Sequence, residues 1–153
     1  MALYELLDTK SIVPNLQAET KDAAIEELVD VLDRAGRLRD RGAVLDAVLE
    51  RERAMSTGLE DGIAVPHAKT AAVGTLTAAL GVRREGLEFD SADGKPTNII
   101  FLLIAEENNP GPHVRALAKL ARLLSDPEMR SAIIGAKTAE DIFEIIKQRE
   151  LTE

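Results

Sequence analysis

The sequence contains no cysteine and no tryptophan, and its 153 residues include one tyrosine and three phenylalanines. Without cysteine the chain forms no disulfide bond and has no thiolate that could act as a nucleophile or metal ligand. With so few aromatic rings it has little on which bases or sugars could stack. No apolar run reaches the roughly 18 residues that a membrane-spanning helix needs. These absences exclude thiol chemistry and argue against sugar-stacking grooves and membrane insertion.

Basic residues are in the minority: the chain has 19 Lys and Arg against 27 Asp and Glu, a formal net charge of −8 at pH 7. Nucleic acids and anionic membranes are bound through clustered Lys and Arg, so neither is an expected partner. The N-terminus lacks the basic start, apolar stretch and small-residue cleavage site of a secretory signal. Together with the absence of cysteine this favours a cytoplasmic protein. The length predicts one domain over residues 1–153.

The spacing of apolar residues predicts alternating helices and strands. Helices are expected at residues 20–36, 40–55, 113–126, 126–135 and 138–151, and strands at 63–65, 75–84 and 98–105. The residues expected to cap helices are Thr20, Asp40, Asp126 and Thr138. The apolar strand NIIFLLIA, at 98–105, is typical of a sheet covered on both faces. The order of elements therefore predicts an α/β sandwich with a mixed sheet.

The loop STGLEDGIAVPH, which ends at His67, is the stretch of greatest chemical interest. The chain has no P-loop, no dinucleotide-binding glycine motif, no nucleophile elbow and no HExxH zinc motif. A neutral imidazole offers an unprotonated nitrogen that can act as a nucleophile. A phosphoryl group on it needs donors for three oxygens, and this region supplies loop N–H groups, the hydroxyls of Ser56 and Thr57, and the guanidinium groups of the pair Arg51 and Arg53. These residues together predict a phosphoryl-carrying histidine.

The stretch RERAMSTGLEDGIAVPHAK, residues 51–69, closely resembles the active-site segment of the enzyme IIA domains of the fructose-mannitol class, or type 2, in the phosphoenolpyruvate-dependent phosphotransferase system. That class includes the nitrogen-regulatory IIA branch. The order of helices and strands resembles the family across nearly all of the chain. The resemblance implies an α/β fold whose mixed parallel and antiparallel sheet has about five strands, flanked by helices on both faces.

Carried over to this sequence, the resemblance makes His67 the phosphorylated nucleophile, His113 the second active-site histidine and Arg51 the guanidinium that contacts the phosphoryl group. The chain departs from the family at two positions, because members commonly have glycine where it has Glu60 and where it has Ala68.

The resemblance also implies the partners. The histidine-containing phosphocarrier protein would donate the phosphoryl group and an enzyme IIB would accept it, with no metal or organic cofactor. In a second hypothesis the chain is a regulatory module, and phosphorylation of His67 controls its binding to a transporter, a kinase or another target.

Each of these residues also has a plainer interpretation. His67 and His113 could be structural histidines, or two ligands of a metal completed by Glu60 or Asp61. Arg51 and Arg53 could lie on a solvated helix face, paired with Glu50 and Glu52. Ser56 and Thr57 could instead bond to their own loop backbone.

Overall fold

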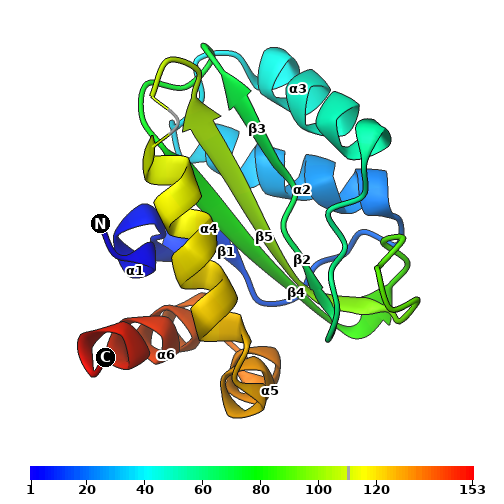
Figure 1. The fold of residues 1–153 in the computed structure, drawn as a ribbon, viewed down its shortest axis with the longest axis vertical. Helices are drawn as coiled ribbons and strands as arrows, with labels where there is room; N and C mark the ends of the chain where they lie inside the picture. Colours follow the sequence, from blue (N-terminus) through cyan, green and yellow to red (C-terminus); the bar gives the residue numbers. More distant parts are fainter. Residues whose placement is uncertain (110) are drawn as a thin grey trace.

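The computed structural model describes residues 1–109 and 111–153 and contains one mixed sheet between two groups of helices (Figure 1). The helices are α1 (Leu3–Leu6), α2 (Lys21–Arg34), α3 (Arg41–Ala54), α4 (Gly111–Leu124), α5 (Pro127–Gly135) and α6 (Ala139–Leu151). The strands are β1 (Ile12–Val13), β2 (Ile63–Ala64), β3 (His67–Thr70), β4 (Thr77–Leu87) and β5 (Thr97–Glu106). The predicted fold class, with its five-stranded mixed sheet and helices on both faces, is confirmed.

Four of the helices begin where the sequence predicts a cap. The side chains of Thr20, Asp40, Asp126 and Thr138 each accept a hydrogen bond from a backbone N–H in the first turn. Such bonds satisfy donors that a helix leaves free at its N-terminus. The cap predictions are therefore confirmed, although α1 and β1 were not predicted because each is very short.

The sheet is built around β4 and β5, which pair antiparallel. Strand β1 adds parallel to the free side of β4, while β2 and β3 add one after the other, both parallel, to the free side of β5. Pro66 stands between β2 and β3 and keeps this edge continuous, because its carbonyl accepts the N–H of Leu103 at 3.0 Å. A proline fits an edge strand, where its missing N–H leaves no partner unpaired. The sequence predicted the first of these edge strands but not β3.

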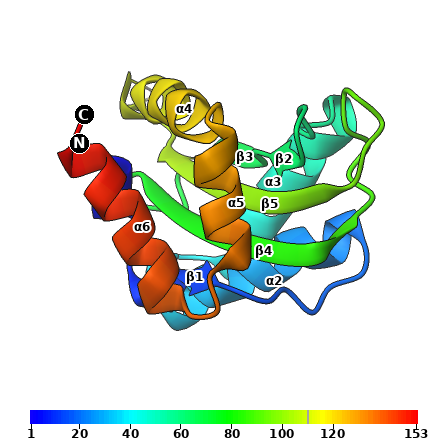
Figure 2. The ribbon, with the colours of Figure 1, turned by 90° about the horizontal axis from the view of Figure 1, so that it is seen from below.

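Side chains alternate along the central strands and fill two separate cores. Leu80, Phe101 and Leu103 pack with α1, α4, α5 and α6, whereas Ile100 and Leu102 pack with α2 and α3. Figure 1 shows α4 crossing in front of the strands and α2 behind them, and Figure 2 shows α5 next to α4 and alongside α6. The edge strand β3 therefore lies where helices from both layers, α3 and α4, can reach it.

The short helix α1 near the start of the chain packs against α6 near its end. The carboxylate of Glu150 in α6 accepts the backbone N–H groups of Leu3 and Tyr4, both at 2.8 Å. These bonds satisfy the N-terminus of α1 and attach it to α6. Among the described residues, no helix has the length and apolar character required to cross a bilayer.

Gly62, directly before β2, has a backbone conformation and surroundings that only glycine fits well. Its φ is +78°, and a Cβ at this position would lie 2.7 Å from the Asn98 side-chain oxygen. We expect Gly62→Ala to lower the free energy of unfolding by about 1–3 kcal/mol, because the substitution combines backbone strain with a clash. Gly135→Ala is the matched control, since a Cβ there meets no atom within 4 Å. Urea unfolding measures both, and equal values for the two variants would contradict this account of the loop.

Candidate active site around His67

His67 is the first residue of the edge strand β3, and its orientation is fixed by a hydrogen bond to its own loop. Its Nδ1 lies 2.9 Å from the carbonyl oxygen of Val65. A carbonyl oxygen can only accept, so Nδ1 carries the proton and Nε2 of the neutral ring has a free lone pair. Ala68, the next residue, packs into the core with α2 and α3, and the alternation of the strand therefore turns His67 toward α4. The geometry leaves Nε2 as the ring nitrogen with the available lone pair.

His113 lies beside His67, as the resemblance implies. It is in the first turn of α4, its side chain is 4% exposed, and the centroids of the two imidazole rings are 5.1 Å apart. Among the residues that the structure describes, its Nδ1 has no hydrogen-bond partner. Burial lowers the pKa of His113 to about 4, assisted by electrostatic interactions with His67 and Lys69. His113 is therefore neutral at neutral pH before any phosphoryl group is present.

The lowered pKa of His113 makes the stability of the protein depend on pH. The unfolded chain binds this proton below about pH 6.5, whereas the folded protein binds it only near pH 4. Stability is therefore fully present above pH 6.5 and falls as the pH is lowered to 4, by about 3 kcal/mol from this group. We expect urea unfolding of His113→Gln to lose correspondingly less stability over the same interval. Equal pH dependence in the variant and the wild type would contradict the assignment.

A polar pocket of about 550 Å³ joins His67 to the basic side chains around it. We use the name for the cavity lined by Glu50, Arg51, His67, Lys69 and His113, together with three alanines. Arg51 projects from the last turn of α3, where its Nη1 donates to the carbonyl of Met55 at 3.2 Å. Arg53, two residues further along, is exposed and is not among the lining residues. Arg51 thus lines the polar pocket together with the two histidines, and Arg53 does not.

An apolar groove of about 650 Å³ lies on another side of His67 and also includes Arg51. We use this name for the cavity whose apolar lining residues are Met55, Leu59, Ile63, Val65, Ala92, Leu117, Leu120, Ala121 and Leu124. Met55 and Leu59 are 69% and 48% exposed, which is high for large apolar side chains. Glu60 is exposed and lines the same groove. His67 therefore lines both the polar pocket and the apolar groove.

Ser56 and Thr57 line the apolar groove beside His67, but both hydroxyls have local partners. The Ser56 hydroxyl donates to the carbonyl of Phe89 at 2.8 Å and accepts the N–H of Gly58 at 3.1 Å. The Thr57 hydroxyl donates to a carboxylate oxygen of Glu52 at 2.6 Å. Both side chains therefore help to hold the loop, and their contact with a phosphoryl group stays a prediction.

Two residues near the site were missed from the sequence. Glu52 was considered as a partner of the arginines on a solvated helix face, and this is wrong because its side chain is buried. Lys69 received no role, yet it lines the polar pocket two positions after His67 on the same strand. Residues two apart on a strand share a face, so predicting β3 as a strand would have placed Lys69 on the same face as His67.

A metal site at the two histidines would need a third protein ligand. Within residues 1–109 and 111–153, no three His, Cys, Asp or Glu side chains are grouped so that they could hold a metal ion.

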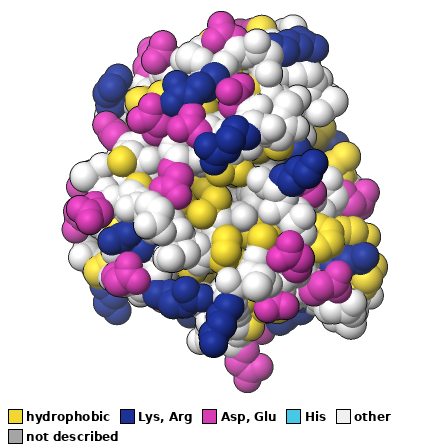
Figure 3. All heavy atoms as spheres, turned by 180° about the vertical axis from the view of Figure 1, so that it is seen from behind, with side chains coloured by type: hydrophobic (Ala, Val, Ile, Leu, Met, Phe, Trp, Pro, Cys, Tyr) yellow, Lys and Arg dark blue, Asp and Glu magenta, His cyan; other side chains and the backbone are white. Residues whose placement is uncertain are grey.

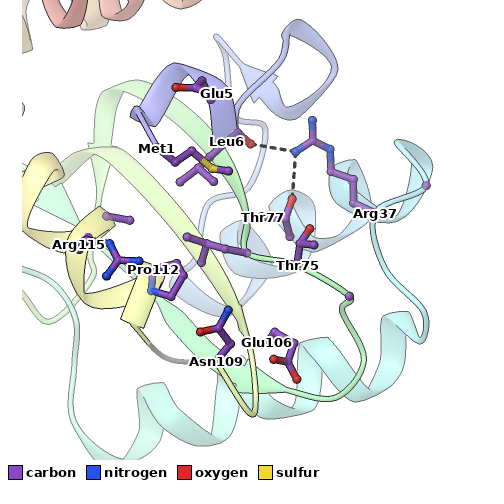
Figure 4. A pocket seen from close by; sticks show the side chains of 14 residues that line it. Met1, Glu5, Leu6, Arg37, Thr75, Thr77, Glu106, Asn109, Pro112 and Arg115 are labelled. Carbon is purple, nitrogen blue, oxygen red and sulfur yellow. Dashed lines mark hydrogen bonds between the residues drawn. The ribbon is translucent and has the colours of Figure 1, made fainter.

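A further cavity of about 700 Å³ lies near α1 and the first turn of α4, away from His67 (Figure 4). No histidine lines it. Arg37 lies at its edge, and its guanidinium donates to the carbonyl of Leu6 at 2.9 Å and to the hydroxyl of Thr77 at 3.1 Å. It also pairs with Asp8. Arg115 also lines the cavity, but none of its described lining residues is a histidine, so it offers less for phosphoryl transfer to a histidine than the polar pocket.

The face of the molecule opposite to that of Figure 1 shows neither histidine (Figure 3). Acidic and basic side chains are interspersed across it. The chemistry described above therefore belongs to the other faces of the molecule.

Residues 5–149 match the family model described as "Phosphoenolpyruvate-dependent sugar phosphotransferase system, EIIA 2". The fructose-specific EIIABC component of Bacillus subtilis is 39% identical over 150 residues, which make up 98% of this chain and 24% of that protein. The chain thus spans about a quarter of that relative. The fructose-specific EIIA component of Haloferax volcanii is 37% identical over 129 residues, covering 84% of each chain. A crystal structure of the nitrogen regulatory protein IIA-Ntr from Neisseria meningitidis has a TM-score of 0.86 and 34% identity, covering 94% of this chain and 98% of that one.

Proposed function

Because the chain belongs to the EIIA type 2 family of the phosphoenolpyruvate-dependent sugar phosphotransferase system, we propose that His67 is the residue that carries the phosphoryl group. The observation that supports this most directly is the hydrogen bond from Nδ1 of His67 to the carbonyl of Val65. This bond directs the lone pair of the neutral imidazole to Nε2, the atom that must attack phosphorus. We also propose that residues 1–153 form one domain, since both cores pack on a single sheet.

The proposed donor is the phosphohistidine of the histidine-containing phosphocarrier protein. In the first step Nε2 of His67 attacks the phosphorus, a new N–P bond forms, and the N–P bond of the donor breaks. The pair of electrons from that bond returns to the donor imidazole. No proton has to leave Nε2, because the Nδ1–H tautomer already has its lone pair there. The transfer therefore depends on positioning and on charge stabilisation rather than on an added cofactor.

The polar pocket supplies the groups that stabilise the transferred phosphoryl. Arg51 can donate two N–H groups to its oxygens, and Lys69 adds a second positive charge. His113 begins neutral, with its pKa lowered to about 4 by burial and by electrostatic interactions with His67 and Lys69. A phosphoryl group on His67 brings negative charge beside it, which favours protonation of His113. His113 is thereby suited to donate an N–H to the phosphoryl group once that group arrives.

The apolar groove is the proposed docking surface for both partners. Its exposed Met55 and Leu59 line the same groove as His67, which a partner must approach to within bonding distance. An apolar surface next to the reacting atom supplies binding energy and excludes water from the transfer. The proposed acceptor is an enzyme IIB, and the name of the EIIABC relative supports this choice because it places A and B units in one protein.

A second function, regulation, is favoured by the similarity to the nitrogen regulatory protein IIA-Ntr. A phosphoryl group on His67 adds about 1.5 to 2 negative charges at the edge of the apolar groove. That change is large enough to abolish or create a docking surface for a target protein. In this function the phosphoryl group is read by a partner rather than passed to one.

Transfer to enzyme IIB separates the two functions. We expect the phosphorylated chain to lose its phosphoryl group when mixed with the enzyme IIB proteins of the same organism, and one of them to gain it. Phos-tag electrophoresis with radiolabelled phosphoenolpyruvate follows both proteins. If none of the enzyme IIB proteins accepts the group while the phosphorylated and unphosphorylated chains differ in binding to another target, the carrier function is overturned and regulation is supported.

A further inference from the structure

Glu52 is the one buried acidic side chain among the described residues, with 4% of its surface exposed. It occupies the last turn of α3, directly after Arg51. Burying a carboxylate is costly unless charges and hydrogen bonds compensate, so its partners indicate what the position does.

Those partners come from two other segments. Lys21, the first residue of α2, lies 2.8 Å from one oxygen of Glu52. Glu52 also accepts the N–H of Thr57 at 2.8 Å and the hydroxyl of Thr57 at 2.6 Å. Burial alone would lower the pKa of Lys21, but its bonds to Glu52 and Asp90 raise that pKa, so Lys21 stays charged. The carboxylate is fully engaged and fixes Thr57 relative to α2 and α3.

The contacts continue from Thr57 to the reacting histidine. The carbonyl of Thr57 accepts the N–H of Val65 at 3.1 Å, and the carbonyl of Val65 accepts Nδ1–H of His67 at 2.9 Å. Thr57 is thus bonded to Glu52 and to Val65, and Val65 is bonded to Thr57 and to His67. The Val65 carbonyl, which selects the tautomer of His67, is thus connected to Glu52 through Thr57.

We infer that Glu52 is a positioning residue for phosphoryl transfer: through Thr57 and Val65 it holds the carbonyl that keeps the proton of His67 on Nδ1 and leaves Nε2 free. Glu52 touches neither His67 nor a phosphoryl oxygen in this arrangement. The inference rests on the proposed function of His67, but its central element, the tautomer, exists in the protein without a phosphoryl group.

The test measures the tautomer of His67 and the rate of transfer in the same variants. Long-range proton–nitrogen NMR on protein labelled in histidine reports which ring nitrogen carries the proton, at a pH above the ordinary pKa of histidine. The rate is followed with the phosphorylated phosphocarrier protein as donor. The main variant is Glu52→Gln, which keeps the shape of the side chain and removes its charge. Asp46→Asn is the matched control, because it removes a negative charge from an exposed position on the same helix.

We expect the wild type and Asp46→Asn to hold His67 in the Nδ1–H form. Glu52→Gln should show a mixture of tautomers and a transfer rate lower by about tenfold, while most of the protein remains folded. The inference is overturned if Glu52→Gln keeps the Nδ1–H form and the wild-type rate, whatever its stability, because Glu52 would then be structural only.

Thr57→Val is the second variant, and it replaces Glu52→Gln in the test if Glu52→Gln does not fold. It removes the hydroxyl bond to Glu52 but retains the backbone N–H and carbonyl of residue 57. We expect a partial shift toward the Nε2–H tautomer and a smaller loss of rate, and an unchanged tautomer overturns the inference. If the wild type itself accepts no phosphoryl group, the proposed function fails, but the tautomer measurement still decides whether Glu52 positions His67.

Discussion

His67→Ala will not accept a phosphoryl group from the phosphorylated phosphocarrier protein under conditions in which the wild type is fully modified. The variant has no Nε2, and the loss of a nucleophile typically reduces a rate on the order of 10⁴-fold or more. Intact mass spectrometry under alkaline conditions measures the result, because the N–P bond is cleaved in acid. The added phosphoryl mass should appear only in the wild type.

The fold of this variant should persist, since His67 lies on an edge strand, is only partly buried, and makes one side-chain hydrogen bond. A circular-dichroism spectrum and a urea transition close to those of the wild type serve as the control. A phosphoryl mass on His67→Ala would place the group on another residue, with His113 the first to examine, and would contradict the assignment.

Arg51→Gln will bind the phosphocarrier protein but transfer the phosphoryl group about 10²- to 10³-fold more slowly. Arg51 lines the polar pocket with both histidines, where a guanidinium can hold two phosphoryl oxygens at once. Glutamine offers fewer donors and no charge. Single-turnover kinetics with the phosphorylated donor give the rate directly, separate from the binding step.

Arg53→Gln is the matched control for this prediction. It removes the same charge from the same helix, but Arg53 is exposed and lines neither the polar pocket nor the apolar groove. Its rate should stay within about twofold of the wild type, since a single exposed charge contributes little. Equal losses in the two variants would mean that Arg51 acts through the overall charge of α3 rather than by contact with the phosphoryl group.

Much of the fold could be predicted from the sequence because its signals are local. A polar cap followed by apolar residues at helical spacing marks α2, α3, α5 and α6, and the apolar run 98–105 marks β5. Strand β3 has no such signal, because His67 to Thr70 read HAKT after a proline and pair only through the edge of β5. Its pairing is decided by the tertiary fold, which overrides weak local preference.

The residues that line the polar pocket could be predicted in part, but the residues that hold His67 in place were not predicted. The loop sequence and the resemblance indicate His67, His113 and Arg51, and the structure brings all three around one pocket. Glu52 was missed because it stands between two arginines, yet it lies four and eight residues after the buried Val48 and Val44. That spacing continues the buried face of α3 and could have identified it. The role of the Val65 carbonyl could not be predicted from the sequence, because every residue type has a backbone carbonyl that could accept this hydrogen bond.

Nε2 of His67 is the atom proposed to carry the phosphoryl group, and locating the phosphorus on the ring tests this proposal. Nitrogen-15 histidine labelling combined with phosphorus NMR of the phosphorylated wild type reports which nitrogen is coupled to phosphorus. We expect coupling to Nε2 of His67, with the proton retained on Nδ1. Coupling to Nδ1 of His67, or to either nitrogen of His113, would contradict it.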